Sequence, residues 1–334
     1  MDRLTFLKRA VRKVRAALLP EGPARVGVSG VFTADQIELV RATYFGEGGS
    51  ANGPNWEPFR HAHMALPAWF VHGLDPLREA YAEQQQKLWQ LVSGVDRPYA
   101  AEVDEKEHSW GDVDPVRQPG FYLRRDPAAV HGASDHIIAT GMMLRHSGLK
   151  PGDHALEYGA GFGQTALAMA RLGVNVDTVD ISATFCEFVR AQAEYFKVPL
   201  QSFHGRFGSN PRPGQKYQLI WFYESFHHCV DFQQVVRQLG DHLAPGGRVM
   251  LAGEPIVEQE NAAVPYPWGL RLHSEVVAVV RQQHWFELGF SEDFLFALFA
   301  GAGYVGGRVE CESTLFGRLY LFERQPASVH LGNH

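Results

Sequence analysis

The sequence has little of several features that would mark a particular class of protein. Only three of its 334 residues are cysteine, Cys186, Cys229 and Cys311. An odd number without paired spacing argues against a disulfide framework and fits a reducing compartment. No apolar run reaches the roughly 18 residues that a membrane-spanning helix needs. The formal net charge of −6 also lacks the basic excess of a general nucleic-acid binder. These absences predict a cytoplasmic protein without a nucleic-acid partner.

The first residues qualify the cytoplasmic assignment. Apolar side chains recur there at steps of three and four residues, at Leu4, Leu7, Val11, Val14 and Leu18. This spacing predicts one apolar stripe on a helix over residues 1–19, with basic side chains around it. Such a helix either packs its stripe on the body of the protein or lies on the anionic inner face of a membrane as a peripheral contact. The pattern alone leaves both arrangements open.

The remaining chain divides into two predicted parts. Residues 1–115 read as a mainly helical, loop-rich extension, and whether residues 20–115 make a homodimer contact is left open. Residues 116–325 alternate strands with helices, which predicts an α/β domain. Its sheet is expected to be parallel, with helices on both faces and an antiparallel strand near the C-terminus. An insertion at about 255–290 interrupts this alternation.

The stretch "ALEYGAGFGQ", residues 155–164, places three alternating glycines at a predicted strand-to-helix turn. The dinucleotide fingerprint requires its third glycine at the sixth position, which Gln164 occupies here. A P-loop is excluded as well, because no Gly-Lys-Ser/Thr follows. The turn therefore does not match the usual binders of nucleotide phosphates.

In this region the chain resembles the class I S-adenosylmethionine-dependent methyltransferases, over about residues 135–325. The resemblance rests on Glu157-Tyr158-Gly159-Ala160-Gly161-Phe162-Gly163, on Asp180 at the end of the next strand, and on the lead-in "LAPGGRVML". It implies a Rossmann-like fold and S-adenosylmethionine as the cofactor. Glycines without Cβ let the backbone approach a cofactor closely. A carboxylate at a strand end can accept hydrogen bonds from ribose hydroxyls.

The resemblance also implies a set of cofactor-binding residues. They are Glu157, Tyr158, Gly159, Ala160, Gly161, Gly163, Asp180, Ile181, Phe207 and Tyr122. Tyr122 and Arg124 belong to "GFYLRRDP", which is similar to the segment that closes over the cofactor in this family. The chain departs from the pattern at Arg206 and Phe207, where an acid often stands near the adenine, and at Gln218, where an aspartate often begins the strand. Backbone groups and stacking are the expected substitutes at the adenine.

The catalytic candidates follow the fourth predicted strand, in "FYESFHHCVDF". Glu224 precedes His227 and His228 by three and four residues, so on a helical turn one pair shares a face. A carboxylate beside an imidazole raises its basicity and makes a general base. We favour His228 as that base; the alternative is that both histidines only line the pocket.

Substrate contacts are expected from the end of the fifth strand and from the insertion. Glu254 is placed to bind substrate hydroxyls, and the insertion offers aromatic and hydrogen-bonding side chains in Trp268, Arg271, His273 and Trp285. Aromatic rings pack on sugar faces, while arginine and histidine hold hydroxyls or anions. Two histidines in "HAH", His61 and His63, have no further ligands nearby in sequence. No metal site is predicted.

The sequence thus favours a methyltransferase that methylates an oxygen of a small molecule, such as a sugar or glycan precursor. Two alternatives stay open. One is N- or C-methylation of a natural-product intermediate, for which a base matters less. The other is a non-catalytic scaffold that binds the cofactor. Methylation of nucleic acid is disfavoured by the charge and by the lack of an Asn-Pro-Pro-aromatic motif after the fourth strand.

Overall fold

The computed structural model describes residues 30–45, 54–105, 112–123, 125 and 127–325. The predicted helix of residues 1–19 and Arg124 lie outside these residues. Within them, no helix has the length and apolarity that crossing a membrane would require.

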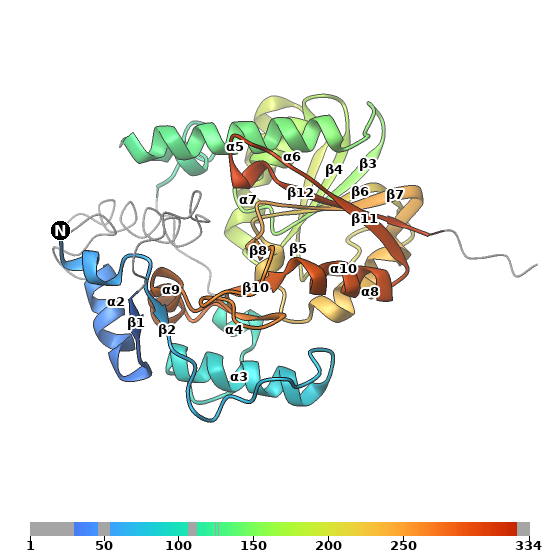
Figure 1. Cartoon of the computed structure of the whole chain (residues 1–334). Helices are drawn as coiled ribbons and strands as arrows, with labels where there is room; N and C mark the ends of the chain where they lie inside the picture. Colours follow the sequence, from blue (N-terminus) through green and yellow to red (C-terminus); the bar gives the residue numbers. More distant parts are fainter. Residues whose placement is uncertain (1–29, 46–53, 106–111, 124, 126, 326–334) are drawn as a thin grey trace, which may run out of the picture.

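A seven-stranded sheet forms the centre of the fold (Figure 1). Its strands, in spatial order, are β11 (Tyr304–Val309), β12 (Leu319–Arg324), β7 (Leu243–Ala252), β6 (Tyr217–Tyr223), β3 (His154–Tyr158), β4 (Asn175–Asp180) and β5 (Leu200–His204). The five strands from β7 to β5 pair in parallel. β12 is antiparallel to both of its neighbours. The α/β, Rossmann-like sheet predicted from the alternation is therefore confirmed, including its antiparallel C-terminal strand.

Alternate side chains of the central strands enter two separate cores. On one face Ala155 and Trp221 pack under three helices, α5 (Pro127–His146), α6 (Gln164–Ala170) and α7 (Ala183–Phe196). On the other face Leu156 and Phe222 pack with α8 (Phe232–His242) and α10 (Glu292–Gly301). Since both faces of the sheet are buried, its strands read as nearly continuous apolar runs.

The second core continues into a further layer, built from two distant parts of the chain. The first supplies β1 (Val31–Phe32), η1 (Ala34–Gln36), α2 (Ile37–Phe45), η2 (Pro54–Phe59), β2 (His63–Met64), α3 (Glu79–Ser93) and α4 (Ala101–Asp104). The insertion supplies β8 (Ile256–Val257), β9 (Trp268–Leu270), α9 (Ser274–Gln283) and β10 (Leu288–Ser291). We call residues 30–45, 54–105 and 255–291 together the cover.

The two parts of the cover are joined by backbone hydrogen bonds and by packing. The N–H of Met64 donates to the carbonyl of Leu272, and that of Ser274 to Ala62. Helix α9 packs on both α2 and α3, and its residues from Val276 to Val280 are all buried. The extension and the insertion thus share one core below the sheet in Figure 1. The division of the chain near residue 115 into two domains stays a prediction.

Candidate active site

The glycine turn follows β3 at the carboxyl edge of the sheet. Gly159, Gly161 and Gly163 have positive φ angles of 69°, 53° and 65°, a region that residues with a Cβ rarely adopt. A Cβ on Gly159 would stand 2.6 Å from the Cβ of Ser225, whereas one on Gly161 would meet nothing within 4 Å. The turn therefore needs glycine for close approach at Gly159, and it faces open space at Gly161.

Asp180 ends β4 beside this turn. Its Oδ2 accepts a hydrogen bond from the backbone N–H of Gly161 at 2.9 Å, and its Oδ1 accepts one from Ser182 at 2.8 Å. Burial raises the pKa of the Asp180 carboxyl. Each oxygen keeps a further lone pair, so the carboxylate that braces the turn can also accept hydroxyl donors.

Glu157 supports the turn from behind. Its side chain is only 1% exposed, and the hydroxyl of Thr165, in the first turn of α6, donates to it. Burial raises the pKa of Glu157 to about 8, against the opposing effect of the Thr165 hydrogen bond. These contacts tie β3 to α6; a direct contact between Glu157 and a cofactor stays a prediction.

Phe207 and Tyr158 contact each other beside the same turn. The Tyr158 phenol donates to the carbonyl of Ser209 at 2.7 Å, and its ring is buried. The Phe207 ring meets it edge-on, with centroids 6.1 Å apart. Phe207 also approaches to 3.2 Å the point where a Cβ on Gly159 would stand. Of the two rings, Phe207 is thus the one placed to pack on a nucleobase.

The other predicted cofactor residues lie in nearby loops. Ala160 and Ile181 are half-buried directly after β3 and β4. Tyr122 lies on the short helix η3 (Gly120–Leu123) with half of its surface exposed. This helix is attached to the glycine turn, because the side chain of Gln164 donates to the carbonyl of Pro119 at 2.8 Å.

The chain leaves β6 through Glu224, which adopts a left-handed φ of 50°. The hydroxyl of Ser225 then donates to the carbonyl of Tyr158 at 2.8 Å. A single 3₁₀ turn, η4 (Phe226–His228), follows. The sharp turn and this hydrogen bond hold Ser225, the residue directly before η4, against the glycine turn.

Glu254, two residues after β7, holds η4 in place. Its carboxylate accepts backbone hydrogen bonds from Ser225, Phe226 and His227 at 2.8–3.1 Å, and a fourth from Nδ1 of His227 at 2.8 Å. Burial raises the pKa of Glu254 to about 7, although the three backbone donors oppose the shift. Four donors around one carboxylate favour its ionised form and place the proton on Nδ1. Substrate binding by Glu254 stays a prediction.

His227 and His228 have opposite pKa shifts although they are adjacent. Burial and the charge of His228 hold the pKa of His227 well below 6.5. Burial alone would also lower the pKa of His228, but the carboxylates of Glu105 and Glu287 outweigh it and raise the pKa to about 9. At neutral pH His227 is therefore a neutral base and His228 a cation. The ion pairs of the two imidazoles involve Glu254, Glu287 and Glu105. The catalytic role expected for Glu224 stays a prediction.

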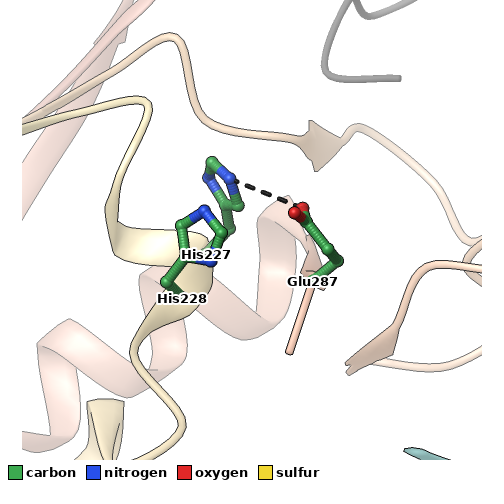
Figure 2. Close-up of side chains that lie close together, drawn as sticks. All are labelled: His227, His228 and Glu287. Carbon is green, nitrogen blue, oxygen red and sulfur yellow. Dashed lines mark ion pairs between the residues drawn. The ribbon is translucent and has the colours of Figure 1, made fainter. Parts of the chain in front are cut away.

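Glu287 faces the other nitrogen of His227 from the cover. Figure 2 shows its carboxylate pointing toward the two imidazoles. Oε2 of Glu287 lies 3.7 Å from Nε2 of His227. The guanidinium of Arg271 forms a buried ion pair with the same carboxylate. The donor atoms of His227, His228 and Glu287 lie within 4.8 Å of one another, and such donors can hold a metal ion. The guanidinium of Arg271, which pairs with Glu287, opposes a further cation in the cluster. Metal-free function therefore stays our prediction.

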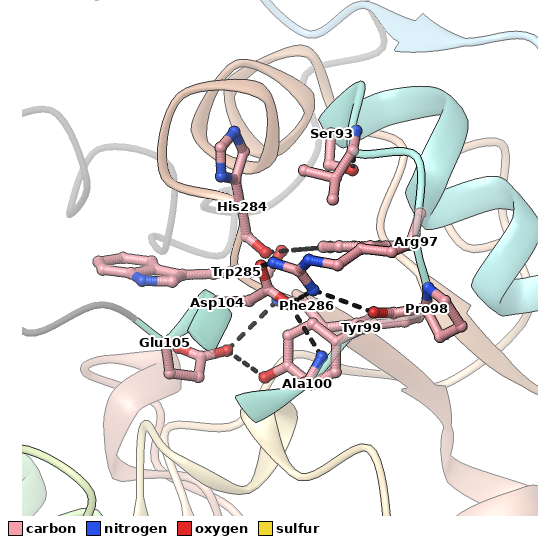
Figure 3. A network of polar contacts seen from close by, with 12 residues as sticks. Ser93, Arg97, Pro98, Tyr99, Ala100, Asp104, Glu105, His284, Trp285 and Phe286 are labelled. Carbon is pink, nitrogen blue, oxygen red and sulfur yellow. Dashed lines mark hydrogen bonds and ion pairs between the residues drawn. The ribbon is translucent and has the colours of Figure 1, made fainter. Parts of the chain in front are cut away.

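A polar network of the cover surrounds Glu105 (Figure 3). Glu105 lies 3.5 Å from Nδ1 of His228 and accepts hydrogen bonds from the Tyr99 hydroxyl at 2.6 Å and the Phe286 N–H at 3.4 Å. One residue before it, Asp104 forms a bidentate ion pair with Arg97 at 2.6 and 2.7 Å. These hydrogen bonds and the ion pair fix the position of the Glu105 carboxylate, which raises the pKa of His228.

The predicted substrate residues separate into two groups. Trp285 is half-buried and meets the His228 ring edge-on at 5.8 Å, and Arg271 reaches the cluster through Glu287. Trp268 instead fills the core, where its indole N–H donates to the carbonyl of Pro76 at 2.7 Å. His273 precedes α9 and pairs through its backbone with His63.

Sequence reasoning missed Glu105 and Glu287. Glu287 had a usable signal, since it is the one charged residue in the apolar run "WFELGF", and a charge on a buried strand requires a partner. Glu105 lies in the acidic stretch "AEVDEKE" without any motif. Only the folded chain brings it to His228.

The strand order, the glycine turn and the acid after the second parallel strand define the Rossmann-like class of nucleoside-cofactor domains. Comparison with known proteins narrows this class. Residues 155–247 match the family model described as a methyltransferase domain. The chain is also 30% identical over 190 residues to 27-O-demethylrifamycin SV methyltransferase of Amycolatopsis mediterranei (strain S699). That match covers 56% of this chain and 65% of the relative, so it spans less than two thirds of the relative's length.

Solved structures with a similar fold include an S-adenosylmethionine-dependent methyltransferase from Aquifex aeolicus, at 14% identity and a TM-score of 0.42. The match covers 60% of this chain and 98% of the Aquifex aeolicus chain. The [4+2]-cyclase SpnF matches at 13% identity and a TM-score of 0.46, covering 73% and 96% of the two chains. The family match over residues 155–247 and the curated relative support the resemblance of this region to the class I S-adenosylmethionine-dependent methyltransferases.

Proposed function

We propose that this chain transfers a methyl group from S-adenosylmethionine to a hydroxyl oxygen of a small molecule. The observation that carries the proposal is the His227–Glu254 pair beside the glycine turn. Glu254 binds Nδ1 at 2.8 Å, and Nε2 has no hydrogen-bond partner among the described residues. A neutral imidazole in this state is ready to take a proton from a hydroxyl.

The residues around the turn fit the cofactor. The open space at Gly161 lets the cofactor approach the backbone of the turn closely. The carboxylate of Asp180 is suited to its ribose hydroxyls, and the ring of Phe207 to its adenine. When bound, the cofactor supplies an electrophilic methyl group and leaves as S-adenosylhomocysteine. Binding of the cofactor by this chain is an inference from its family and from this fit.

His227 and His228 have different roles toward the acceptor. The acceptor oxygen gives its proton to Nε2 of His227 while its bond to the methyl carbon forms, and Glu254 stabilises the resulting imidazolium. Protonated His228 stabilises the negative charge that develops on the oxygen. Pairs of groups whose pKa values are driven apart commonly serve such complementary roles.

Methylation of oxygen is further supported by the name of the curated relative, which describes methyl transfer to 27-O-demethylrifamycin SV. The half-buried ring of Trp285 near His228 suits a ring-containing acceptor such as a sugar, a glycan precursor or a hydroxylated natural product. Peripheral membrane contact through residues 1–19 and a homodimer stay separate proposals.

The proposal is tested by calorimetry with S-adenosylhomocysteine and by mass spectrometry of acceptor pools incubated with methyl-labelled S-adenosylmethionine. We expect micromolar binding and a labelled O-methyl product. Tight binding of NADH without heat from either sulfur compound would overturn the cofactor assignment. Cofactor binding without product from any pool would indicate the scaffold alternative. Product whose rate is unchanged by His227→Asn at every pH would indicate N- or C-methylation.

A further inference from the structure

Two hydrogen-bond acceptors lie next to each other in the cluster without donors. Nε2 of His227 and Oε1 of Glu287 are fully buried and have no hydrogen-bond partner among the described residues. The two side chains are 3.7 Å apart at their nearest atoms, Nε2 and Oε2. A buried polar atom without a hydrogen-bond partner destabilises the protein. A ligand that satisfies both atoms must therefore bring two donors.

Three kinds of ligand could satisfy two adjacent acceptors: a pair of neighbouring hydroxyls, an ammonium group or a metal ion. The charges around the cluster distinguish them. Arg271 already neutralises Glu287 through their buried ion pair, so the carboxylate needs a hydrogen-bond donor and not a further positive charge. An ammonium or a metal ion would add a second cation beside Arg271 in a buried site. Two hydroxyls add no charge.

We propose that the acceptor carries hydroxyls on two adjacent carbons, as in a vicinal diol or a catechol, and that Glu287 selects for the second one. This inference rests on the proposed function. One hydroxyl gives its proton to Nε2 of His227 and takes the methyl group. The other donates its hydrogen bond to Oε1 of Glu287 and keeps its proton. A single methyl group is transferred, and the product is a monomethyl ether beside a free hydroxyl.

The route into the cluster follows from burial. His227, Arg271 and Glu287 are buried, whereas His228 and Trp285 are only half-buried. The acceptor therefore enters past the imidazole of His228 and the indole of Trp285, and its hydroxyls reach inward to Glu287. In this arrangement Arg271 is a positioning residue, because its ion pair fixes which Glu287 oxygen stays available.

The test compares matched pairs of small probes on the protein with S-adenosylhomocysteine and without it. The pairs are catechol with phenol, and cis-1,2-cyclohexanediol with cyclohexanol, measured by NMR of protein labelled with ¹⁵N at histidine. We expect one of the two diols to bind at least about tenfold more tightly than its monohydroxyl partner, since one recovered hydrogen bond to a charged group is worth roughly 1.5 kcal/mol. If catechol is the diol that binds more tightly, the acceptor is aromatic; if cis-1,2-cyclohexanediol is, the acceptor is aliphatic. The Nε2 resonance of His227 should shift on binding.

Glu287→Asp keeps the negative charge but moves the carboxylate oxygen away from the ligand. The ratio of the diol's affinity to that of its monohydroxyl partner should fall to about one, while phenol or cyclohexanol binds as before. Glu287→Gln serves as a second variant if the first unfolds. Equal binding within both pairs, or no binding of either diol, would overturn the proposal. So would stoichiometric Zn²⁺ or Mn²⁺ in the purified protein that is lost in His227→Asn. Because the preference is also measured without cofactor, its failure is distinguishable from failure to bind S-adenosylhomocysteine.

Discussion

The pair His227 and His228 shows how one 3₁₀ turn produces two chemically different imidazoles. Their ring centroids are 4.4 Å apart, so a charge on one disfavours a charge on the other. Glu105 lies on the side of His228, while Glu254 fixes the proton on Nδ1 of His227. The two carboxylates thereby assign the neutral form to one histidine and the charged form to its neighbour.

His227→Asn is expected to lower kcat by about 10²–10⁴-fold, the usual contribution of a general base, with little change in the affinity for S-adenosylhomocysteine. Asparagine keeps a donor toward Glu254, so η4 should stay in place. His228→Gln is the matched control. It removes the cation but not the base and should cost less in kcat. If His228→Gln lowers kcat more than His227→Asn does, the assignment is reversed: His228 is then the general base, as the sequence favoured, and His227 is not.

The raised pKa of His228 predicts a specific dependence of stability on pH. A group whose folded-state pKa of about 9 exceeds its ordinary 6.5 binds its proton more tightly in the folded protein. It contributes fully below pH 6.5, and the contribution is lost as the pH rises to 9. The shift corresponds to roughly 3 kcal/mol. Thermal unfolding of the wild type and of His228→Gln should therefore converge between pH 6.5 and 9.5. A constant difference across this range would contradict the assignment.

At the scale of the element, the glycine turn and η4 act as one unit, because Ser225 contacts both Gly159 and the carbonyl of Tyr158. Gly159→Ala should lower the affinity for S-adenosylhomocysteine at least tenfold, since the new Cβ would displace Ser225. Gly152→Ala is the control: Gly152 also has a positive φ, of 91°, but a Cβ there meets nothing within 4 Å. Both variants should lose about 1–2 kcal/mol of stability from backbone strain. Only Gly159→Ala should lose binding in calorimetry.

The same elements show what the sequence could predict. The order of strands and the glycine turn follow from local patterns, because a parallel sheet buried on both faces requires long apolar runs and its turns require positive φ. The partners of the histidines do not follow from local patterns. Helical spacing predicted Glu224 as the partner of an imidazole, but Glu224 has a left-handed φ of 50° and the helical segment after it is only one 3₁₀ turn. Glu254 and Glu105 come from 27 residues later and 123 residues earlier than His227 and His228, respectively.

At the scale of the whole molecule, the cover makes the active site depend on residues far outside the methyltransferase domain match. Glu105 comes from the extension before it, and Arg271 and Glu287 from the insertion after it. The two parts share one core with the lower face of the sheet. Loss of packing within the cover should therefore impair catalysis even where the cofactor site is intact.

Trp89→Ala tests this dependence. The indole is fully buried, lies parallel to the Phe286 ring at 6.1 Å and donates to the carbonyl of His284 at 3.1 Å. Its removal should cost about 3–5 kcal/mol of stability. Because Phe286 donates to Glu105 and precedes Glu287, the KM for the acceptor should rise while binding of S-adenosylhomocysteine stays near that of the wild type.

Trp69→Ala is the matched control, since Trp69 also lies in the cover but is only half-buried, under the ammonium of Lys87 at 4.3 Å. It should cost less stability and leave the KM for the acceptor unchanged. Differential scanning calorimetry and steady-state kinetics below the unfolding temperature separate the two effects. If Trp89→Ala lowers stability but leaves acceptor kinetics unchanged, the cover supports the fold without shaping the acceptor site, and the placement of Glu105 and Glu287 in catalysis fails with it.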